Sequence, residues 1–286
     1  MTPSGLAVLL KPAGMTSFEV VSWARRRFAE RRVGHAGTLD PAAAGVMVVA
    51  VGTATRWLSF LDGTKGYVGE VAFGRATSTG DATGTTLLQQ ATAVTEEVLR
   101  SLLPAFTGTI RQRPPAVSAV RIEGRRAHER VRSGEVVVVP EREVRIEQLE
   151  LLAFDEARQV ARLAVTCSAG TYIRSLAEDL GRALEVPAHL SFLVRTRAGA
   201  WTLADAEALD EEGPSPVLWP VDTAMAHWPR VDLDAPDEIM AFRQGKAQAS
   251  TGGPEGKLAV WHLGRFAGLA RMDAGLLRPE RVVPQA

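Results

Sequence analysis

The segment Gly45-Val46-Met47-Val48-Val49-Ala50-Val51-Gly52 gives the clearest structural signal in the chain. It is apolar and rich in β-branched residues, and a glycine bounds it at each end. Such a run predicts a short strand that is buried on both faces. The chain therefore contains at least one strand in the core of a sheet.

Upstream of this strand, the sequence predicts a helix that begins at Thr16 and ends near Glu30. Thr16 and Glu19 have the spacing of a capping box, in which each side chain satisfies a backbone N–H at the helix start. Apolar residues then recur at helical spacing and predict the buried face of this helix: Phe18, Val21, Ala24 and Phe28.

Downstream of it, strand and helix patterns are interspersed. Residues 65–74 and 158–168 alternate between apolar and polar side chains, which predicts two strands. Residues 173–184 have a helical pattern that ends before Pro187. This order predicts a mixed α/β or α+β body.

Composition is that of an ordinary folded protein. The chain has 286 residues, with 33 basic and 33 acidic side chains, 46% hydrophobic residues and 23% charged residues. This balance excludes a disordered chain and a highly basic protein that coats nucleic acid. The length is sufficient for two domains.

An acidic, proline-rich segment separates the two predicted domains. Residues 203–240 contain ten acidic residues and one basic residue, Arg230. We place the boundary near Pro229, with a first domain over residues 1–228 and a small C-terminal domain over residues 229–286.

The C-terminal domain has the pattern of a small β-barrel. Two short apolar runs, at residues 258–261 and 266–270, flank a turn at Gly264. This arrangement is typical of a hairpin.

Basic residues concentrate in two parts of the neutral chain. Five arginines lie between Arg25 and Arg32, and residues 111–145 hold nine arginines against five acids. Local basic surfaces of this kind suit a polyanionic partner. They can equally be the solvated faces of helices and loops.

Several classes of site are absent from the sequence. The single cysteine, Cys167, excludes an intramolecular disulfide and lies in a strand pattern typical of a buried apolar residue. Five histidines lack metal-ligand spacing, and no dinucleotide or phosphate-loop motif is complete. We expect no metal and no cofactor. The apolar run at residues 6–10 is too short for a signal peptide, and no run could span a bilayer, so we expect a cytoplasmic protein.

Three residues are candidates for chemistry. Asp40 lies in a glycine-rich loop before Pro41, where its carboxylate can face a cleft or simply cap a turn. Tyr67 lies on a predicted strand, where its ring can serve as a flat stacking surface or can pack in the core. Arg174 lies in the first turn of a helix, where the helix dipole disfavours a cation. A carboxylate or phosphate partner would explain it, although it can also be a surface arginine.

Six motifs, taken in order, resemble those of one family, the bacterial tRNA pseudouridine synthase B type. They are Leu9-Leu10-Lys11-Pro12-Ala13-Gly14-Met15-Thr16-Ser17, Gly34-His35-Ala36-Gly37-Thr38-Leu39-Asp40-Pro41, Lys65-Gly66-Tyr67, Gly80-Asp81-Ala82-Thr83-Gly84, Arg113-Pro114-Pro115-Ala116-Val117-Ser118-Ala119 and Gly170-Thr171-Tyr172-Ile173-Arg174. The C-terminal part is similar to the family's small RNA-binding PUA barrel. The resemblance implies an α+β fold, with a mixed, largely antiparallel sheet in the catalytic domain and a PUA-like β-barrel after it.

The resemblance also implies a reaction and its residues. The reaction is the isomerisation of a uridine to pseudouridine at position 55, in the T-arm loop of tRNA. Asp40 matches the catalytic aspartate, and Arg174 matches the arginine that pairs with it. Tyr67 matches the tyrosine that stacks on the flipped base and is placed to help remove the C5 proton. Leu193 matches an apolar residue near the base, and His35 a histidine that stacks in the rearranged RNA loop. We expect Asp40 to be buried and held negative by the guanidinium.

Further residues follow from the resemblance on the RNA-binding side of the site. Lys11, with Pro12, matches a motif that supports the catalytic loop. Residues 121–145 correspond to an insert that grips RNA. Its first three arginines are candidate RNA contacts: Arg121, Arg125 and Arg126. The sequence departs from the family at Ala36, where threonine or serine is usual.

The chemistry of the reaction is redox-neutral, which agrees with the expected absence of a cofactor. Asp40 could attack C1′ of the ribose, attack C6 of the uracil, or remove the C2′ proton, and the sequence leaves these routes open. We expect tRNA as the partner, no guide RNA, no membrane and a monomer. Three alternatives stay open: an RNA-binding or tRNA-folding module without catalysis, a synthase acting on another RNA, and a glycosidase that uses Asp40 with Asp81.

Overall fold

The computed structural model of the protein describes residues 3–115, 117, 121–122, 125–126, 135, 139–250 and 252–283. The chain divides into two compact units. The first comprises residues 1–59 and 63–218, and the second comprises residues 60–62 and 219–286.

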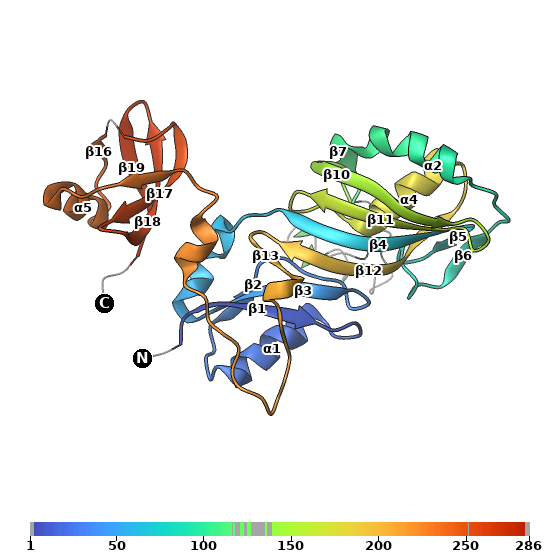
Figure 1. Cartoon of the computed structure of the whole chain (residues 1–286), viewed down its shortest axis with the longest axis horizontal. Coiled ribbons are helices and arrows are strands. Elements are labelled where there is room, and N and C mark those ends of the chain that lie inside the picture. Colours follow the sequence, from blue (N-terminus) through green and yellow to red (C-terminus); the bar gives the residue numbers. More distant parts are fainter. Residues whose placement is uncertain are drawn as a thin grey trace. The chain divides into compact units, whose positions relative to one another are not determined.

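A ten-stranded sheet forms the centre of the first unit (Figure 1). Its main path runs β14-β1-β3-β12-β4-β11-β10-β7, with β2 added beside β3 and β13 beside β12. Two of its pairs are parallel, β1 with β14 and β12 with β3, and the others are antiparallel. This confirms the mixed, largely antiparallel sheet. The strands are β1 (Gly5–Lys11), β2 (Val33–His35), β3 (Ala44–Val51), β4 (Lys65–Phe73), β7 (Gly108–Gln112), β10 (Arg142–Asp155), β11 (Val160–Cys167), β12 (Ala188–Ala198), β13 (Trp201–Thr202) and β14 (Glu207–Ala208).

Helices cover this sheet at two places. Helix α1 (Ser17–Arg27) packs its buried side chains on β1 and β3. Helices α2 (Glu96–Leu102) and α4 (Ile173–Ala183) contribute to a second core together with β4, β10 and β11. Cys167 lies fully buried in that second core, which confirms that it is a packing residue.

Helix α1 begins as predicted, with a capping box between Thr16 and Glu19. It ends at Arg27 rather than near Glu30, because Ala29 has a φ of +50°, which a continuing helix cannot accommodate. The prediction that Phe18 is buried is wrong, since this side chain is 68% exposed. The inward position in the first turn belongs to Ser17, which lies one residue earlier and contacts the loop before β3.

The other predicted elements of the first unit are confirmed within one or two residues. They are the buried strand β3, the alternating strands β4 and β11, and the helix α4. Two smaller pairs complete the described part: β5 (Arg75–Thr77) with β6 (Thr86–Gln89), and β8 (Arg121–Ile122) with β9 (Arg125–Arg126).

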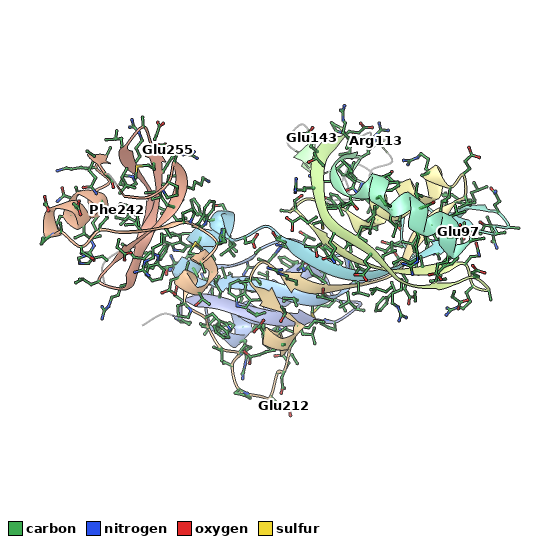
Figure 2. The ribbon with its side chains drawn as sticks, turned by 45° about the horizontal axis from the view of Figure 1, so that its top comes forward. Glu97, Arg113, Glu143, Glu212, Phe242 and Glu255 are labelled. Atoms are coloured by element: carbon green, nitrogen blue, oxygen red, sulfur yellow. The ribbon has the colours of Figure 1, made fainter. Side chains whose placement is uncertain are left out.

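The second unit is a small sheet with one helix. Five strands lie in the order β15-β17-β18-β19-β16 around an apolar core that includes Phe242, on helix α5 (Pro236–Arg243). The strands are β15 (Arg230–Asp232), β16 (Gln248–Ala249), β17 (Gly256–His262), β18 (Arg265–Asp273) and β19 (Leu276–Val282). Figure 2 shows the side chain of Phe242 in this unit. The predicted hairpin around Gly264 is confirmed as β17 and β18.

None of the helices in the described ranges combines the length and the apolar character needed to cross a membrane.

Candidate active site

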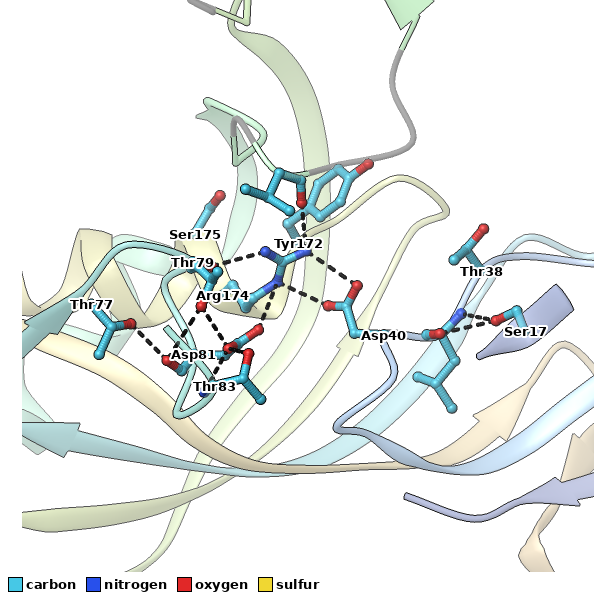
Figure 3. A network of polar contacts seen from close by, with 12 residues as sticks. Ser17, Thr38, Asp40, Thr77, Thr79, Asp81, Thr83, Tyr172, Arg174 and Ser175 are labelled. Atoms are coloured by element: carbon cyan, nitrogen blue, oxygen red, sulfur yellow. Dashed lines mark hydrogen bonds and ion pairs between the residues drawn. The ribbon is translucent and has the colours of Figure 1, made fainter. Parts of the chain in front are cut away.

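The loop that carries Asp40 is held on both sides of this residue. On one side, the Ser17 hydroxyl accepts a hydrogen bond from the Leu39 N–H and donates one to the Leu39 carbonyl, both at 2.9 Å (Figure 3). On the other side, the Gly14 N–H donates to the Pro41 carbonyl at 2.8 Å. Both neighbours of Asp40 are therefore fixed, so the carboxylate extends from a rigid backbone.

Lys11 lies beneath the same loop and is fully buried. Its Nζ donates to the carbonyls of Pro12, Met15 and Pro41 at 2.9, 2.5 and 3.2 Å. Burial, together with the charge of Arg195, lowers the pKa of Lys11 to about 8, although the charge of Asp40 acts in the opposite direction. The structure thus places Lys11 where it supports the loop from inside, with its ammonium directed at backbone carbonyls.

Asp40 and Arg174 come from segments far apart in the chain and form a two-point ion pair. The Arg174 Nε lies 2.8 Å from Asp40 Oδ2, and its Nη2 lies 3.1 Å from Asp40 Oδ1. Two further donors of the guanidinium bond the carbonyls of Thr79, at 2.8 Å, and Val117, at 3.1 Å. Arg174 is not a surface residue, because only 4% of it is exposed. The carboxylate partner explains its place in the first turn of α4.

The Asp40 side chain itself is 33% exposed. Asp40 is therefore only partly buried, and the expectation of a fully buried acid is wrong. The guanidinium covers one edge of the carboxylate, while the loop leaves the other part open to solvent. This openness is what a carboxylate needs if it is to meet a substrate. The interpretation of Asp40 as a simple turn cap does not hold, since its two oxygens bond Arg174.

A second carboxylate, Asp81, lies on the same guanidinium. Its Oδ2 is 3.8 Å from the Arg174 Nε. Its Oδ1 accepts hydrogen bonds from the hydroxyls of Thr79 and Thr83, at 2.7 and 2.5 Å, and from the Thr83 N–H at 2.9 Å. Burial opposes ionisation, but these hydrogen bonds and the nearby Arg174 outweigh it and lower the pKa of Asp81. From the sequence, Asp81 was identified as part of a family motif and as a possible glycosidase partner of Asp40, but its link to Asp40 through Arg174 was not predicted.

Tyr67 lies on β4 at the buried face of the sheet. It is 8% exposed and belongs to the same apolar cluster as Leu39 and Leu193. Burial raises the pKa of Tyr67, while the charge of Arg195 acts in the opposite direction. Tyr67 is thus a core aromatic that packs in the same cluster as Leu39, the residue before Asp40.

Leu193 and His35 lie around this centre. Leu193 is 8% exposed and packs in the cluster with Tyr67. His35 ends β2, opposite Val49 of β3. Burial lowers the pKa of His35, although a backbone hydrogen bond at Gly37 acts against this. A neutral imidazole at pH 7 follows, which suits stacking better than proton transfer.

A clamp on the start of α4 also escaped the sequence analysis. The side chain of Gln112, which is 1% exposed, accepts from the Tyr172 N–H at 2.7 Å and donates to the Tyr172 carbonyl at 3.0 Å. The Ser175 hydroxyl donates to the Arg113 carbonyl at 2.7 Å. These bonds fix the turn from which Arg174 extends. The only signal for this clamp in the sequence was a polar glutamine at a position that the alternating strand pattern buries.

The predicted RNA-gripping insert is described in part. The hairpin β8–β9 contains Arg121, Arg125 and Arg126, and Arg121 pairs with Arg126 in it. The structure does not describe the side chains of these three arginines. Most of residues 123–138 also lie outside them. Arg142, later in the insert, lies over the ring of Tyr172 at 5.0 Å.

The site as a whole offers one kind of chemistry. It presents a partly exposed carboxylate on a fixed loop, paired with the buried guanidinium of Arg174. Such a carboxylate can act as a nucleophile or a base at a sugar carbon. Among the described residues, no cluster of histidine, cysteine and acidic side chains could hold a metal ion.

Comparison with known proteins identifies the family of this chain. The sequence matches the N-terminal domain of the TruB family of pseudouridylate synthases over residues 25–173, and the C-terminal domain of pseudouridine synthase II TruB over residues 229–283. The chain therefore belongs to the TruB family of pseudouridylate synthases. The resemblance seen in the sequence motifs is confirmed.

Curated relatives are similar over most of the chain. A tRNA pseudouridine synthase B from Corynebacterium aurimucosum is 46% identical over 249 residues, which cover 85% of this chain and 84% of the relative. Another, from Parasynechococcus marenigrum, is 43% identical over 286 residues, which cover 98% of this chain and 97% of the relative.

Solved structures show the same fold. A Cbf5–Nop10–Gar1 complex matches with a TM-score of 0.74 and 26% identity, over 97% of this chain and 84% of that chain. An H/ACA RNP bound to a substrate RNA containing 2′-deoxyuridine matches with a TM-score of 0.73 and 25% identity, over 98% and 85%. These matches confirm the α+β fold with a PUA-like C-terminal part.

Proposed function

We propose that the protein isomerises a uridine of tRNA to pseudouridine, and that this uridine is position 55 in the T-arm loop. The observation that carries the proposal is the two-point ion pair between Asp40 and Arg174 on a loop fixed at both sides. The relatives that match over most of the chain are tRNA pseudouridine synthases B, which supports tRNA as the substrate.

The reaction breaks the N1–C1′ bond, rotates the uracil and joins C5 to C1′. C5 then loses its proton and N1 takes one up, so that nothing is added or lost overall. Asp40 is the residue that acts at the sugar or the base. Attack on C1′, attack on C6 and removal of the C2′ proton all require an ionised carboxylate with one accessible oxygen. The Asp40 side chain is 33% exposed, so a substrate can reach it, and the guanidinium of Arg174 pairs with its carboxylate.

The target base must leave the RNA stack before Asp40 can reach it. Extrusion costs a few kcal/mol, and stacking on an aromatic ring returns about 1–3 kcal/mol. We assign this stacking, and help in removing the C5 proton, to Tyr67. Leu193 packs near the base, and His35 stacks in the RNA loop that the base has left.

Binding of the rest of the tRNA is assigned to basic residues of the insert, Arg121, Arg125 and Arg126. The catalytic domain in this proposal spans residues 1–228 and the PUA-like RNA-binding domain spans residues 229–286. The acidic loop near Glu212 faces away from RNA, because in Figure 2 Glu212 lies at the end of the first unit remote from Arg113 and Glu143.

The protein in this proposal acts as a monomer, without a guide RNA, in the cytoplasm where tRNA is processed. Similarity supports action without a guide. The tRNA enzymes match at 43–46% identity, whereas the Cbf5 and H/ACA structures match at 25–26%.

The test is to incubate the purified protein with an unmodified tRNA transcript and with bulk cellular RNA, and to map every pseudouridine formed. The proposal predicts one new pseudouridine, at position 55 of tRNA. Tight binding with no pseudouridine would favour an RNA-binding or tRNA-folding module. Modification of another RNA alone would show that this RNA, and not tRNA, is the substrate. Release of free uracil would favour a glycosidase that uses Asp40 with Asp81.

A further inference from the structure

Arg195 is a buried cation at the centre of the site that the function proposed above does not use. It lies on β12, directly opposite Tyr67 of β4 on one side and Gly45 of β3 on the other. Only 1% of the residue is exposed. Burying a charge is costly unless the group is well bonded, so a residue of this kind indicates a specific task.

The guanidinium of Arg195 is spread over three backbone carbonyls. Its Nε donates to Val46 at 2.6 Å, its Nη1 to Thr38 at 3.3 Å, and its Nη2 to Gly37 at 3.3 Å. Val46 belongs to β3, whereas Gly37 and Thr38 lie in the loop that leads to Asp40. A single side chain therefore bonds the sheet and the catalytic loop.

The same residue lies beside Tyr67, because Arg195 and Tyr67 are directly opposite each other in the β12–β4 pair, and the charge of Arg195 acts on the phenol. Arg195 thus lies between the two groups that the proposed reaction must hold in register, the loop of Asp40 and the ring of Tyr67. The planar fork of an arginine can bond several acceptors in fixed directions, which a lysine cannot do.

The backbone around Arg195 is shaped for this close approach. Gly45 has a φ of +121°, and a Cβ at this position would lie 2.2 Å from the Arg195 carbonyl oxygen. Only glycine allows β3 to lie so near to the backbone of Arg195. Gly45, which bounds the predicted buried strand, therefore has a packing reason that involves Arg195.

We propose that Arg195 is a positioning residue of this enzyme, which ties the loop of Asp40 to β3 and holds that loop in register with Tyr67 on β4. The proposal rests on the proposed function for the roles of Tyr67 and Asp40. In this arrangement the adjacent positive charge of Arg195 favours loss of the phenol proton of Tyr67.

Electrostatics supports this role. Burial raises the pKa of Tyr67, and Arg195 is the neighbour whose positive charge lowers it. The charge of Arg195 also lowers the pKa of His35 and of Lys11. One guanidinium therefore influences three titratable groups around the loop.

The first experiment measures the phenol of Tyr67 directly. The chain has only two tyrosines, so Tyr172→Phe leaves Tyr67 as the only phenol. The protein is labelled with 3-fluorotyrosine in this background, and the ¹⁹F shift is followed against pH. Arg195→Met should raise the titration midpoint by about one pH unit or more, the range for loss of an adjacent opposite charge. The control is Arg197→Met, an exposed arginine on the same strand, which should leave the midpoint unchanged.

The second experiment measures turnover with Arg195→Lys, which retains the charge but not the planar fork. It should lower kcat at least tenfold, with little change in KM and an unchanged cooperative melting curve. Because this variant retains the charge, it also decides the matter if Arg195→Met does not fold. A midpoint that stays in place in a folded Arg195→Met protein, or a near-normal kcat in Arg195→Lys, would overturn the proposal.

The titration can fail or succeed independently of the proposed function. The titration needs no RNA and no turnover. A protein that forms no pseudouridine would refute the function and leave the midpoint shift intact. An active enzyme whose Tyr67 titrates without regard to Arg195 would refute the role of Arg195 alone.

Discussion

The Nε and Nη2 atoms of Arg174 lie 2.8 and 3.1 Å from the two carboxylate oxygens of Asp40, although 134 positions separate the residues in the chain. Two parallel N–H···O bonds fix the carboxylate in position and in plane. Arg174 is almost fully buried, and Asp40 keeps one-third of its side chain exposed. The pair is therefore rigid on its protein side and open on the side that a substrate can approach.

Arg174→Lys should lower kcat by about 100-fold or more, because an ammonium cannot make the two-point contact and also reach the carbonyls of Thr79 and Val117. Binding of tRNA should change little. Single-turnover formation of pseudouridine at saturating enzyme checks the first point, and a filter-binding titration checks the second. A lysine variant with normal turnover would show that two-point pairing is unnecessary.

Asp81→Asn should lower kcat by roughly tenfold with KM nearly unchanged, since the asparagine keeps an acceptor for Thr79 and Thr83 but removes the second negative charge from Arg174. The effect is smaller than that of Arg174→Lys because the Asp81–Arg174 distance is 3.8 Å. Asp155→Asn, at a remote hairpin, is the matched control. Equal activity of the Asp81→Asn and Asp155→Asn variants would show that the charge of Asp81 near Arg174 does not contribute to turnover.

Ser17→Ala should destabilise the protein by about 1–3 kcal/mol, because the N–H and the carbonyl of Leu39 both lose their partner in a buried position. It should also lower kcat severalfold through the looser loop. Denaturant unfolding and single-turnover rates measure the two effects. Ser101→Ala, which removes an exposed hydroxyl on α2, serves as the control and should be close to neutral. Loss of stability without any loss of rate would mean that the clamp does not position Asp40.

Lys11 should give the free energy of unfolding a distinct pH dependence. Its pKa is lowered from 10.5 to about 8 in the folded protein, so between these values the unfolded state binds more protons than the folded state. Stability must therefore rise with pH across this window and stay flat below it. The measurement is the unfolding free energy of wild type minus that of Lys11→Met, from pH 7 to 10.5. The difference should shift in favour of wild type above pH 8, and a flat difference throughout would contradict the prediction.

Local pattern was enough to predict most elements of the first unit. The capping box of Thr16 and Glu19 and the β-branched run of β3 depend on neighbours in the chain, and both are confirmed. The alternation in β4 and β11 depends on one buried face, and it is also confirmed. These features required no knowledge of the partner strands.

Contacts between residues that are distant in the chain account for the features that the sequence did not reveal. Phe18 fits the helical apolar period, yet Ser17 takes the inward place because Leu39 needs two hydrogen bonds there. Asp81 lies near Arg174, and Arg195 lies opposite Tyr67. Each pair is distant in the chain, so no local spacing could indicate these neighbours. The candidates Asp40, Tyr67 and Arg174 were found because motifs matched a family, and the ion pair of Asp40 with Arg174 became visible only in the fold.

The most direct test of the central claim is the single-turnover rate of pseudouridine formation by Asp40→Asn on an unmodified tRNA, measured beside its tRNA affinity. Asparagine keeps the shape of the side chain and removes the charge that any of the three routes needs. We predict no detectable pseudouridine and an affinity within a fewfold of wild type. Turnover close to that of wild type would contradict the account, because it would show that the carboxylate held by Arg174 does not act on the nucleotide.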